Sequence, residues 1–139
     1  MPNVENRRLG GQSVGALTTQ SALINNGAIF VPGSTAIGLT AHAGGGQASA
    51  LLLTAQYNRV DTVATAADSV ALPAPSYIGQ EVEVMNNAAT NSMQVFGSGT
   101  DTINGVATGT GVAQAAGKFA MYKASSIGAG AAWHRILSA

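Results

Sequence analysis

The pattern of hydrophobic and polar positions changes near residue 47. Before it, short apolar pieces such as residues 28–31 (AIFV) are interrupted by Pro32-Gly33, by residues 25–27 (NNG) and by residues 44–46 (GGG), which are typical of turns and loops. Ordering a backbone costs roughly 1 to 2 kcal/mol per residue, and so few apolar side chains cannot offset that cost alone. We therefore predict an extended arm over residues 1–47, with one or two short strands, that lies on another surface.

Downstream, short strands are predicted. In residues 48–66 the β-branched Thr and Val content from Val60 onward favours a strand, while a helix stays open for residues 48–56. Residues 68–73 predict a short strand that Pro73 closes. Residues 80–85 alternate Glu81 and Glu83 with Val82 and Val84, which is typical of an antiparallel strand with one wet and one dry face.

The Asn-rich stretch that follows predicts a hairpin. Residues 86–91 read as the connection between the strand ending at residue 85 and a second strand at 92–96, because Asn tolerates left-handed backbone angles. Residues 101–105 (DTING) then predict a compact corner, in which Asp101 accepts backbone N–H groups two residues on and Ile103 is the apolar plug. After a further turn at 109–117, residues 118–124 and 133–137 predict the last strands. The fold class is therefore all-β: an antiparallel β-sandwich or barrel over residues 48–139.

Charge is scarce in this sequence. Of its 139 residues, 46% are hydrophobic and 9% are charged, and the formal net charge is zero; ordinary soluble domains have about 25% charged residues. A protein without an excess of positive charge is not expected to bind duplex DNA. A net charge near zero also removes the repulsion that keeps copies apart, so we expect a homo-oligomer.

Several classes of site are not expected. Cysteine is absent, which excludes disulfides and thiolate chemistry. His42 and His134 stand apart from carboxylate clusters and from each other, so no metal site, cofactor or general base is predicted, and His134 is expected to pack or hydrogen-bond beside Trp133. The start lacks the apolar stretch of a secretory signal, and 18 apolar residues never run together, so synthesis in the cytosol without a membrane span is the expectation.

Three further patterns are candidate sites. Glu81 and Glu83 lie about 6.6 to 6.8 Å apart along a strand, a separation compatible with glycoside hydrolysis, although their alternation with valines favours a solvated face. The glycines at 44–46 lack the Lys-Ser/Thr pair of a phosphate loop and read as a flexible joint. Four aromatic residues would suit sugar stacking if they surfaced together, but the core has first claim on them: Tyr57, Phe119, Tyr122 and Trp133.

A resemblance rests on four segments: NRVDTVATAADSVALP (58–73), EVEVMNNAATNSMQVFGSGTDTINGV (81–106), GTGVAQAAGKFAMYKA (109–124) and the terminal AWHRILSA. Together they resemble the small capsid decoration or cementing proteins of tailed double-stranded DNA bacteriophages, and related segments occur in other phage virion proteins. The resemblance covers about residues 48–139. It implies a β-sandwich, in some members a jelly roll, and a non-catalytic virion protein that binds the outer face of the major capsid protein lattice.

The expected function is therefore that of a cement protein on the capsid outer surface, made in the host cytoplasm. The domain at 48–139 would form a homodimer while the arm at 1–47 reaches the capsid. Six arm residues are the expected capsid contacts: Arg7, Arg8, Leu9, Ile29, Phe30 and Val31. Two alternatives stay open: a receptor- or glycan-binding module of a virion fibre that uses Trp133, Tyr122 and the 97–105 loop, and a small hydrolase that uses Glu81 and Glu83.

Overall fold

The computed structural model describes residues 23–25 and 28–139, with side chains from residue 33 onward. Every regular element in these residues is a strand: β2 (Leu23–Asn25), β3 (Ala28–Thr40), β4 (Leu51–Leu52), β5 (Ala55–Thr62), β6 (Ser69–Ala71), β7 (Glu81–Asn86), β8 (Met93–Phe96), β9 (Thr102–Ile103), β10 (Val112–Gln114), β11 (Phe119–Ala124) and β12 (Ala132–Leu137). The prediction of an all-β fold is confirmed for this part of the chain.

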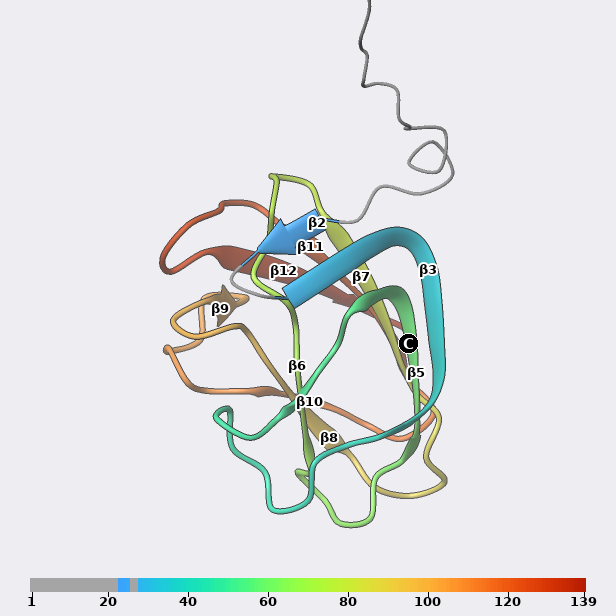
Figure 1. Cartoon of the computed structure of the whole chain (residues 1–139). Coiled ribbons are helices and arrows are strands. Elements are labelled where there is room, and N and C mark those ends of the chain that lie inside the picture. The colour runs from blue at the N-terminus through green and yellow to red at the C-terminus, as the bar shows by residue number, and fades with distance from the viewer. Residues whose placement is uncertain (1–22, 26–27) are drawn as a thin grey trace, which may run out of the picture.

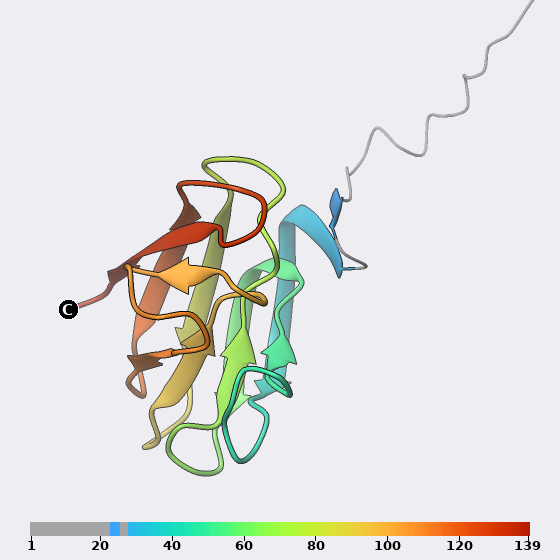
Figure 2. The same cartoon turned by 90° about the vertical axis from the view of Figure 1, so that its left-hand side faces the viewer.

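The strands form two sheets that face each other across the core (Figure 1 and Figure 2). The small sheet has the order β10-β8-β6-β4, and the large sheet has the order β2-β3-β5-β7-β11-β12-β9. Side chains from the inner faces of both sheets make one buried cluster. Each sheet thus covers the apolar face of the other, as two-layer domains require.

The chain winds around this core from β3 to β8. Strands β3, β5 and β7 belong to the large sheet, and the strands between them, β4, β6 and β8, belong to the small sheet. Strands that follow one another within a sheet are consequently parallel, as in β3–β5, β5–β7, β4–β6 and β6–β8. A parallel pair needs a long crossover connection, and here each crossover contains a strand of the opposite sheet.

The C-terminal part adds the remaining strands to both sheets. Strand β10 pairs with β8 in the antiparallel sense, and β11 lies antiparallel to both β7 and β12. Strand β9 adds a short parallel pair to β12, in which Thr102 lies opposite Ala132. The sheets are therefore mixed, and the predicted antiparallel sandwich is wrong on this point. A jelly roll, whose strands are antiparallel, is not confirmed.

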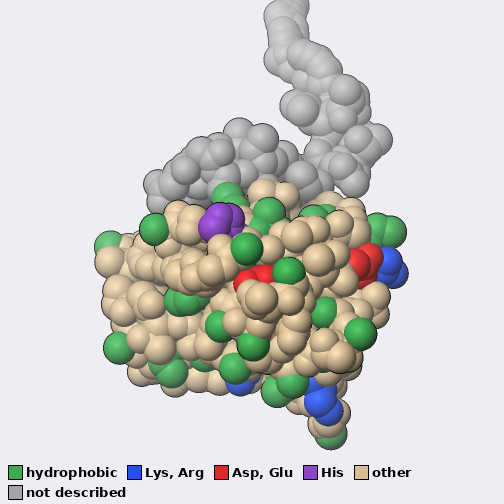
Figure 3. Space-filling model, turned by 90° about the horizontal axis from the view of Figure 1, so that it is seen from below, with side chains coloured by type: hydrophobic (Ala, Val, Ile, Leu, Met, Phe, Trp, Pro, Cys, Tyr) green, Lys and Arg blue, Asp and Glu red, His purple; other side chains and the backbone are tan. Residues whose placement is uncertain are grey.

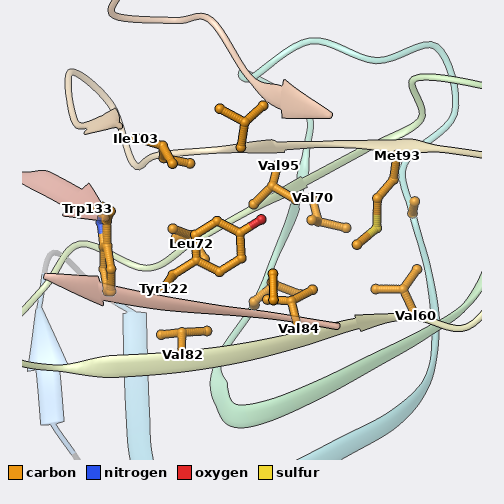
Figure 4. Close-up of a cluster of buried hydrophobic side chains, with 14 of the residues drawn as sticks. Val60, Val70, Leu72, Val82, Val84, Met93, Val95, Ile103, Tyr122 and Trp133 are labelled. Carbon is orange, nitrogen blue, oxygen red and sulfur yellow. The ribbon is translucent and has the colours of Figure 1, made fainter. Parts of the chain in front are cut away.

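The core follows the alternation read from the sequence. In β7, Val82 and Val84 are fully buried while Glu81 and Glu83 are half-buried on the outer side of the large sheet, so the prediction of one wet and one dry face is confirmed. Figure 4 shows the cluster between the sheets, with Trp133 toward one end and Met93 toward the other. Its largest members share a relative exposure below 2%: Trp133, Tyr122, Leu53, Leu72, Met93 and Ile103.

The predicted hairpin at residues 86–91 is wrong. Strand β7, which ends at Asn86, lies in the large sheet, whereas β8, which begins at Met93, lies in the small sheet. Residues 87–92 therefore cross from one sheet to the other instead of reversing the chain within a sheet. The polar turn residues are correct for a connection, but a connection between sheets needs the same residue types as a hairpin.

Other local predictions need smaller corrections. Residues 48–56 contain no helix, and β5 begins at Ala55, earlier than the β-branched run at Val60 suggests. The turn predicted at 109–117 contains a strand, β10, whose three residues pair with β8. The strands expected at 118–124 and 133–137 are confirmed as β11 and β12, within one residue of their bounds.

Part of the predicted arm belongs to the large sheet. Strand β3 runs parallel to β5 with several register shifts, and Gly33 and Gly38 within it have positive φ angles, as bulges in an edge strand often require. Strand β2 covers only the first residues of β3, through pairs such as Leu23 with Phe30. Residues 28–40 thus lie on the β-domain, which is how an arm with few apolar side chains gains its hydrogen bonds.

Candidate functional site

Three connections meet at one end of the molecule, which we call the loop end. They are the β6–β7 connection (72–80), the β8–β9 connection (97–101) and the β11–β12 connection (125–131). The first and third lie at the upper end in both cartoon views (Figure 1 and Figure 2). Tyr77, Ile78 and Ile127 at this end are exposed, by 43%, 67% and 51%. Loops held by a rigid scaffold often carry binding sites, so the loop end is the candidate functional site.

The larger hollow at the loop end lies between these three connections and has a volume of about 510 Å³. Its lining combines small apolar side chains, two hydroxyl groups and one carboxyl group: Ala74, Pro75, Ser98, Gly99, Thr100, Asp101, Gly128 and Ala129. Asp101 is the one ionisable residue among them. We call this space the Asp101 hollow.

Hydrogen bonds fix the walls of the Asp101 hollow. The amide of Gly130 donates to Oγ1 of Thr100 (3.0 Å), which joins two of its connections. Nε2 of Gln47 donates to the carbonyl oxygens of both Gly97 and Gly99, at 2.7 Å each. The amide of Asp101 in turn donates to the carbonyl of Ser98 (2.8 Å). Hydrogen bonds within the protein therefore hold the walls of the hollow in place.

Asp101 has an unusual environment for a carboxyl group. The residue is 6% exposed, and its Oδ1 accepts a hydrogen bond from the amide of Ala131 at 2.9 Å. Its Oδ2 is buried and has no hydrogen-bond partner among the described residues. Burial raises the pKa of Asp101, and the bond from Ala131 opposes that shift in part. The sequence prediction that Asp101 bonds locally, two residues on, missed this partner thirty residues away.

A second, more apolar hollow of about 320 Å³ lies beside the first turn of the β11–β12 connection. Ile78, Gly79, Ala124, Ser125 and the side chains of Lys123 and His134 line it. Nζ of Lys123 lies 2.9 Å from Oε2 of Glu81, so the charge at the rim is already paired within the chain. This hollow offers an apolar contact area without an unsatisfied polar group.

Half of the expected capsid-contact residues lie outside the described part of the chain: Arg7, Arg8 and Leu9. The backbones of Ile29, Phe30 and Val31 belong to β3, where Ile29 and Phe30 pair with β2 and Val31 lies opposite Ala55 of β5. Their side chains are not described. The capsid contacts therefore stay a prediction.

Glu81 and Glu83 lie on the outer face of the large sheet. Glu81 pairs with Lys123 across the β7–β11 register. Neither carboxylate lines either of the two hollows described above. This placement agrees with the interpretation of a solvated face.

The aromatic residues do not form a sugar-stacking platform. Trp133 and Tyr122 are fully buried in the core, where Figure 4 shows them among valine and leucine side chains. The hydroxyl group of Tyr122 donates to Oε1 of Gln114 inside the protein. The expectation that the core takes these rings is confirmed for both residues.

The histidines are exposed and separate. His42 forms an isolated bridge with Ser69, and His134 is on the outer face of β12, opposite to the face that carries Trp133; the expectation that His134 packs beside Trp133 is wrong. The described residues contain no group of three His, Cys, Asp or Glu side chains suited to a metal ion. Nor does the described part include a helix able to cross a membrane.

The Asn-rich segment has a structural task. Nδ2 of Asn86 donates to the carbonyls of Asn91 and Gln114, and Oδ1 accepts from the amide of Ala88. Nδ2 of Asn91 donates to the carbonyls of Val63 and Ala64, at 2.8 and 2.9 Å. These amides satisfy backbone groups where the chain crosses between sheets, so the segment is a tether and not a ligand cradle.

The glycines at 44–46 also serve close packing. A Cβ atom on Gly45 would lie 2.9 Å from the carbonyl oxygen of Ala67, and the amide of Gly44 donates to Oδ1 of Asp68 at 3.2 Å. This arrangement binds the β3–β4 connection to the β5–β6 connection.

Comparison with family models, with curated proteins and with solved structures returned no match.

Proposed function

We propose that this protein is a non-catalytic structural component of a phage virion that attaches to the outer surface of the major capsid protein lattice and stabilises the head. The proposal draws on the sequence resemblance and on one structural observation, the uneven distribution of accessible charge. It includes a homodimer as the attaching unit and synthesis in the host cytoplasm. For the topology it requires only two packed sheets, since attachment depends on the surface and not on a jelly-roll strand order.

Accessible charge gathers on the outer face of the large sheet. The charged residues there alternate with buried ones along β5, β7 and β11: Arg59, Asp61, Glu81, Glu83 and Lys123. Two ion pairs join four of them, at 2.7 Å between Arg59 and Asp61 and 2.9 Å between Lys123 and Glu81. This face suits contact with water.

The rest of the described surface carries little charge. Asp68 and Asp101 are buried, with exposures of 1% and 6%, which leaves Lys118 and Arg135 as the remaining charged side chains of this part of the chain. Figure 3 shows the end of the molecule opposite the loop end, where uncharged atoms also cover most of the surface. Charged residues are depleted at the centres of protein interfaces, so the side formed by the small sheet and the loop end suits a covered surface.

Repetition on a lattice strengthens such a contact. Simultaneous contacts raise the effective concentration of each one, and a protein that binds only the assembled shell stabilises it by about 2.7 kcal/mol when present at a hundredfold its dissociation constant. Uncharged surfaces of modest area therefore suffice for a cement.

Co-sedimentation of the purified protein with empty phage heads tests the proposal. We expect the wild type to sediment with the heads and to raise their disruption temperature. Leu52→Lys, at an exposed position on the small sheet, should reduce attachment at least tenfold, because it places a charge in the covered surface. Glu83→Lys on the charged face is the matched control and should bind like wild type. Failure of the wild-type protein to attach would contradict the proposed function.

The contribution of the N-terminal segment needs a separate variant. Removal of residues 2–22 leaves β3 and its pairing with β5 in place, whereas a deletion to residue 40 would remove a strand of the large sheet. Loss of attachment with retained β-structure would support the predicted contacts of Arg7, Arg8 and Leu9. Unchanged attachment would show that the folded domain binds the heads without residues 2–22.

A further inference from the structure

The Asp101 hollow contains a polar group that the fold does not use. One oxygen of the buried carboxyl group accepts from Ala131, and the other, Oδ2, has no partner among the described residues. Buried polar atoms nearly always have a hydrogen-bond partner, so an unpaired one calls for an explanation, such as a bound ion, water or ligand group. Among the described residues no basic side chain lines the hollow, so this part of the chain supplies no countercharge to Asp101 there.

The other lining groups restrict what can bind. Oγ1 of Thr100 accepts a hydrogen bond from Gly130, and Ser98 adds a second hydroxyl group to the lining. Ala74, Pro75 and Ala129 supply small apolar walls. The lining therefore combines hydrogen-bond acceptors with small apolar side chains, and it contains no aromatic ring on which a sugar could stack.

These features match a primary ammonium group on a methylene chain. An ammonium group has three donors and no acceptor, which fits a lining that holds one carboxyl group and two hydroxyl groups. Its methylene chain can pack along alanine and proline side chains. Because Oδ2 is buried, a bound group has to displace part of the lining to reach it, and a slender group does this more easily than a sugar ring. An ammonium ion also stabilises the ionised form of a nearby carboxyl group, in addition to the hydrogen bond from the amide of Ala131.

We infer that the Asp101 hollow is a binding site for a primary alkylammonium group, of the kind that a lysine side chain of a partner protein presents. Asp101 accepts from the ammonium group, the hydroxyl groups of Ser98 and Thr100 complete its hydrogen bonds, and the walls hold the methylene chain. The inference concerns this hollow alone and holds whether or not the protein attaches to a capsid.

The test is an NMR titration of the full-length protein with Nα-acetyl-lysine N-methylamide. We expect saturable shifts of the amide signals of residues 98–101 and 128–131. The Nε-acetylated derivative and the norleucine derivative, which lack the ammonium group, should bind at least tenfold more weakly. Equal binding of the norleucine derivative, or no saturable shift with the lysine derivative, would overturn the inference. Binding of n-pentylamine would support an ammonium site. Tighter binding of n-pentylamine than of the lysine derivative would identify a free amine as the preferred ligand, and weaker binding would identify a lysine side chain.

Two variants locate the binding. In Asp101→Asn, Oδ1 can still accept from Ala131, so the fold is expected to persist while affinity for the lysine derivative falls at least tenfold. Ala129→Leu narrows the hollow without changing the carboxyl group and should weaken binding as well. Asp61→Asn, on the outer face of the large sheet, is the matched control and should bind like wild type. Undiminished binding by both hollow variants would place the ligand elsewhere and refute the site.

Discussion

The hydroxyl group of Tyr122 donates a hydrogen bond to Oε1 of Gln114 across the buried core, at 2.9 Å. Gln114 belongs to β10 of the small sheet and Tyr122 to β11 of the large sheet. Nε2 of the same glutamine donates to the carbonyls of Val84 (2.9 Å) and Lys118 (2.8 Å). One side-chain amide therefore joins the two sheets at the point where β10 leads into β11.

Replacement of Tyr122 by Phe should lower the free energy of unfolding by about 1 to 3 kcal/mol, because Oε1 of Gln114 then stays buried without a donor. Urea unfolding followed by circular dichroism measures the change. Tyr77→Phe, at an exposed ring, is the control and should stay within about 0.5 kcal/mol of wild type. A smaller effect at Tyr122 than at Tyr77 would contradict this role.

The pH dependence of the same variant supplies a second check. Burial raises the pKa of Tyr122 above its ordinary value, against a smaller opposing effect of Arg135. Stability from a group with a raised pKa is present below its unfolded pKa and is lost as pH rises. The wild type should therefore lose its advantage over Tyr122→Phe above about pH 10, the ordinary tyrosine value. A constant difference through this range would contradict the burial of the phenol.

Asn86→Asp is expected to be more damaging than its small change in shape suggests. Nδ2 of Asn86 donates to two carbonyl oxygens, and a carboxylate in its place would face them without a proton. An uncompensated buried charge costs about 3 to 5 kcal/mol, so unfolding at neutral pH should occur at much lower urea concentration. Acid should restore part of the loss, because a protonated carboxyl group can donate once. Thr90→Asp, in the same connection but exposed, should change stability little.

The sequence predicted burial better than it predicted strand partners. Whether a strand side chain faces the core is a local property of period two, and the alternation at residues 81–84 identified Val82 and Val84 correctly. Partner choice is not local. The residues at 86–91 have turn chemistry that a hairpin and a crossover share, so the sequence could not show that β7 and β8 lie in different sheets.

The candidate site was harder still to predict. The Asp101 hollow is built by three connections far apart in the sequence, and each contributes small residues that are ordinary in loops. The sequence did single out Asp101 as a hydrogen-bond acceptor, but its partner, Ala131, is set by the packing of β9 beside β12. The one local signal was a carboxyl residue two positions before Ile103, an apolar residue that is buried.

Asp68 should make stability depend on pH in the acid range. Its carboxylate accepts from the hydroxyl and amide groups of Thr65, at 2.7 and 3.0 Å, and from the amide of Gly44. The hydrogen bonds from Thr65 hold the pKa of Asp68 below its ordinary value of 3.8, and desolvation opposes them. A depressed folded pKa stabilises the fold above the unfolded pKa, and that contribution is lost as pH falls through the folded pKa.

Asp68→Asn should therefore unfold more readily than wild type at neutral pH, and the two proteins should converge in acid below the ordinary aspartate pKa. Thermal unfolding over a pH series measures this convergence. A difference that stayed constant into strong acid would show that Asp68 acts through shape and not through its charge.

Gly97 tests the packing beneath the loop end. A Cβ atom added there would lie 2.7 Å from the carbonyl oxygen of Asp101 and 2.9 Å from its Cβ, whereas Gly99 has open space at the same position. Overpacking costs about 1 to 3 kcal/mol, so Gly97→Ala should destabilise the protein and shift the amide signals of Asp101 and Ala131. Gly99→Ala adds backbone strain at a positive φ angle but no clash, so it should leave those signals in place. Displacement of Asp101 by the Gly97 variant should also weaken binding of the lysine derivative. Unchanged signals at Asp101 and Ala131 would show that the backbone of Asp101 does not pack closely against Gly97.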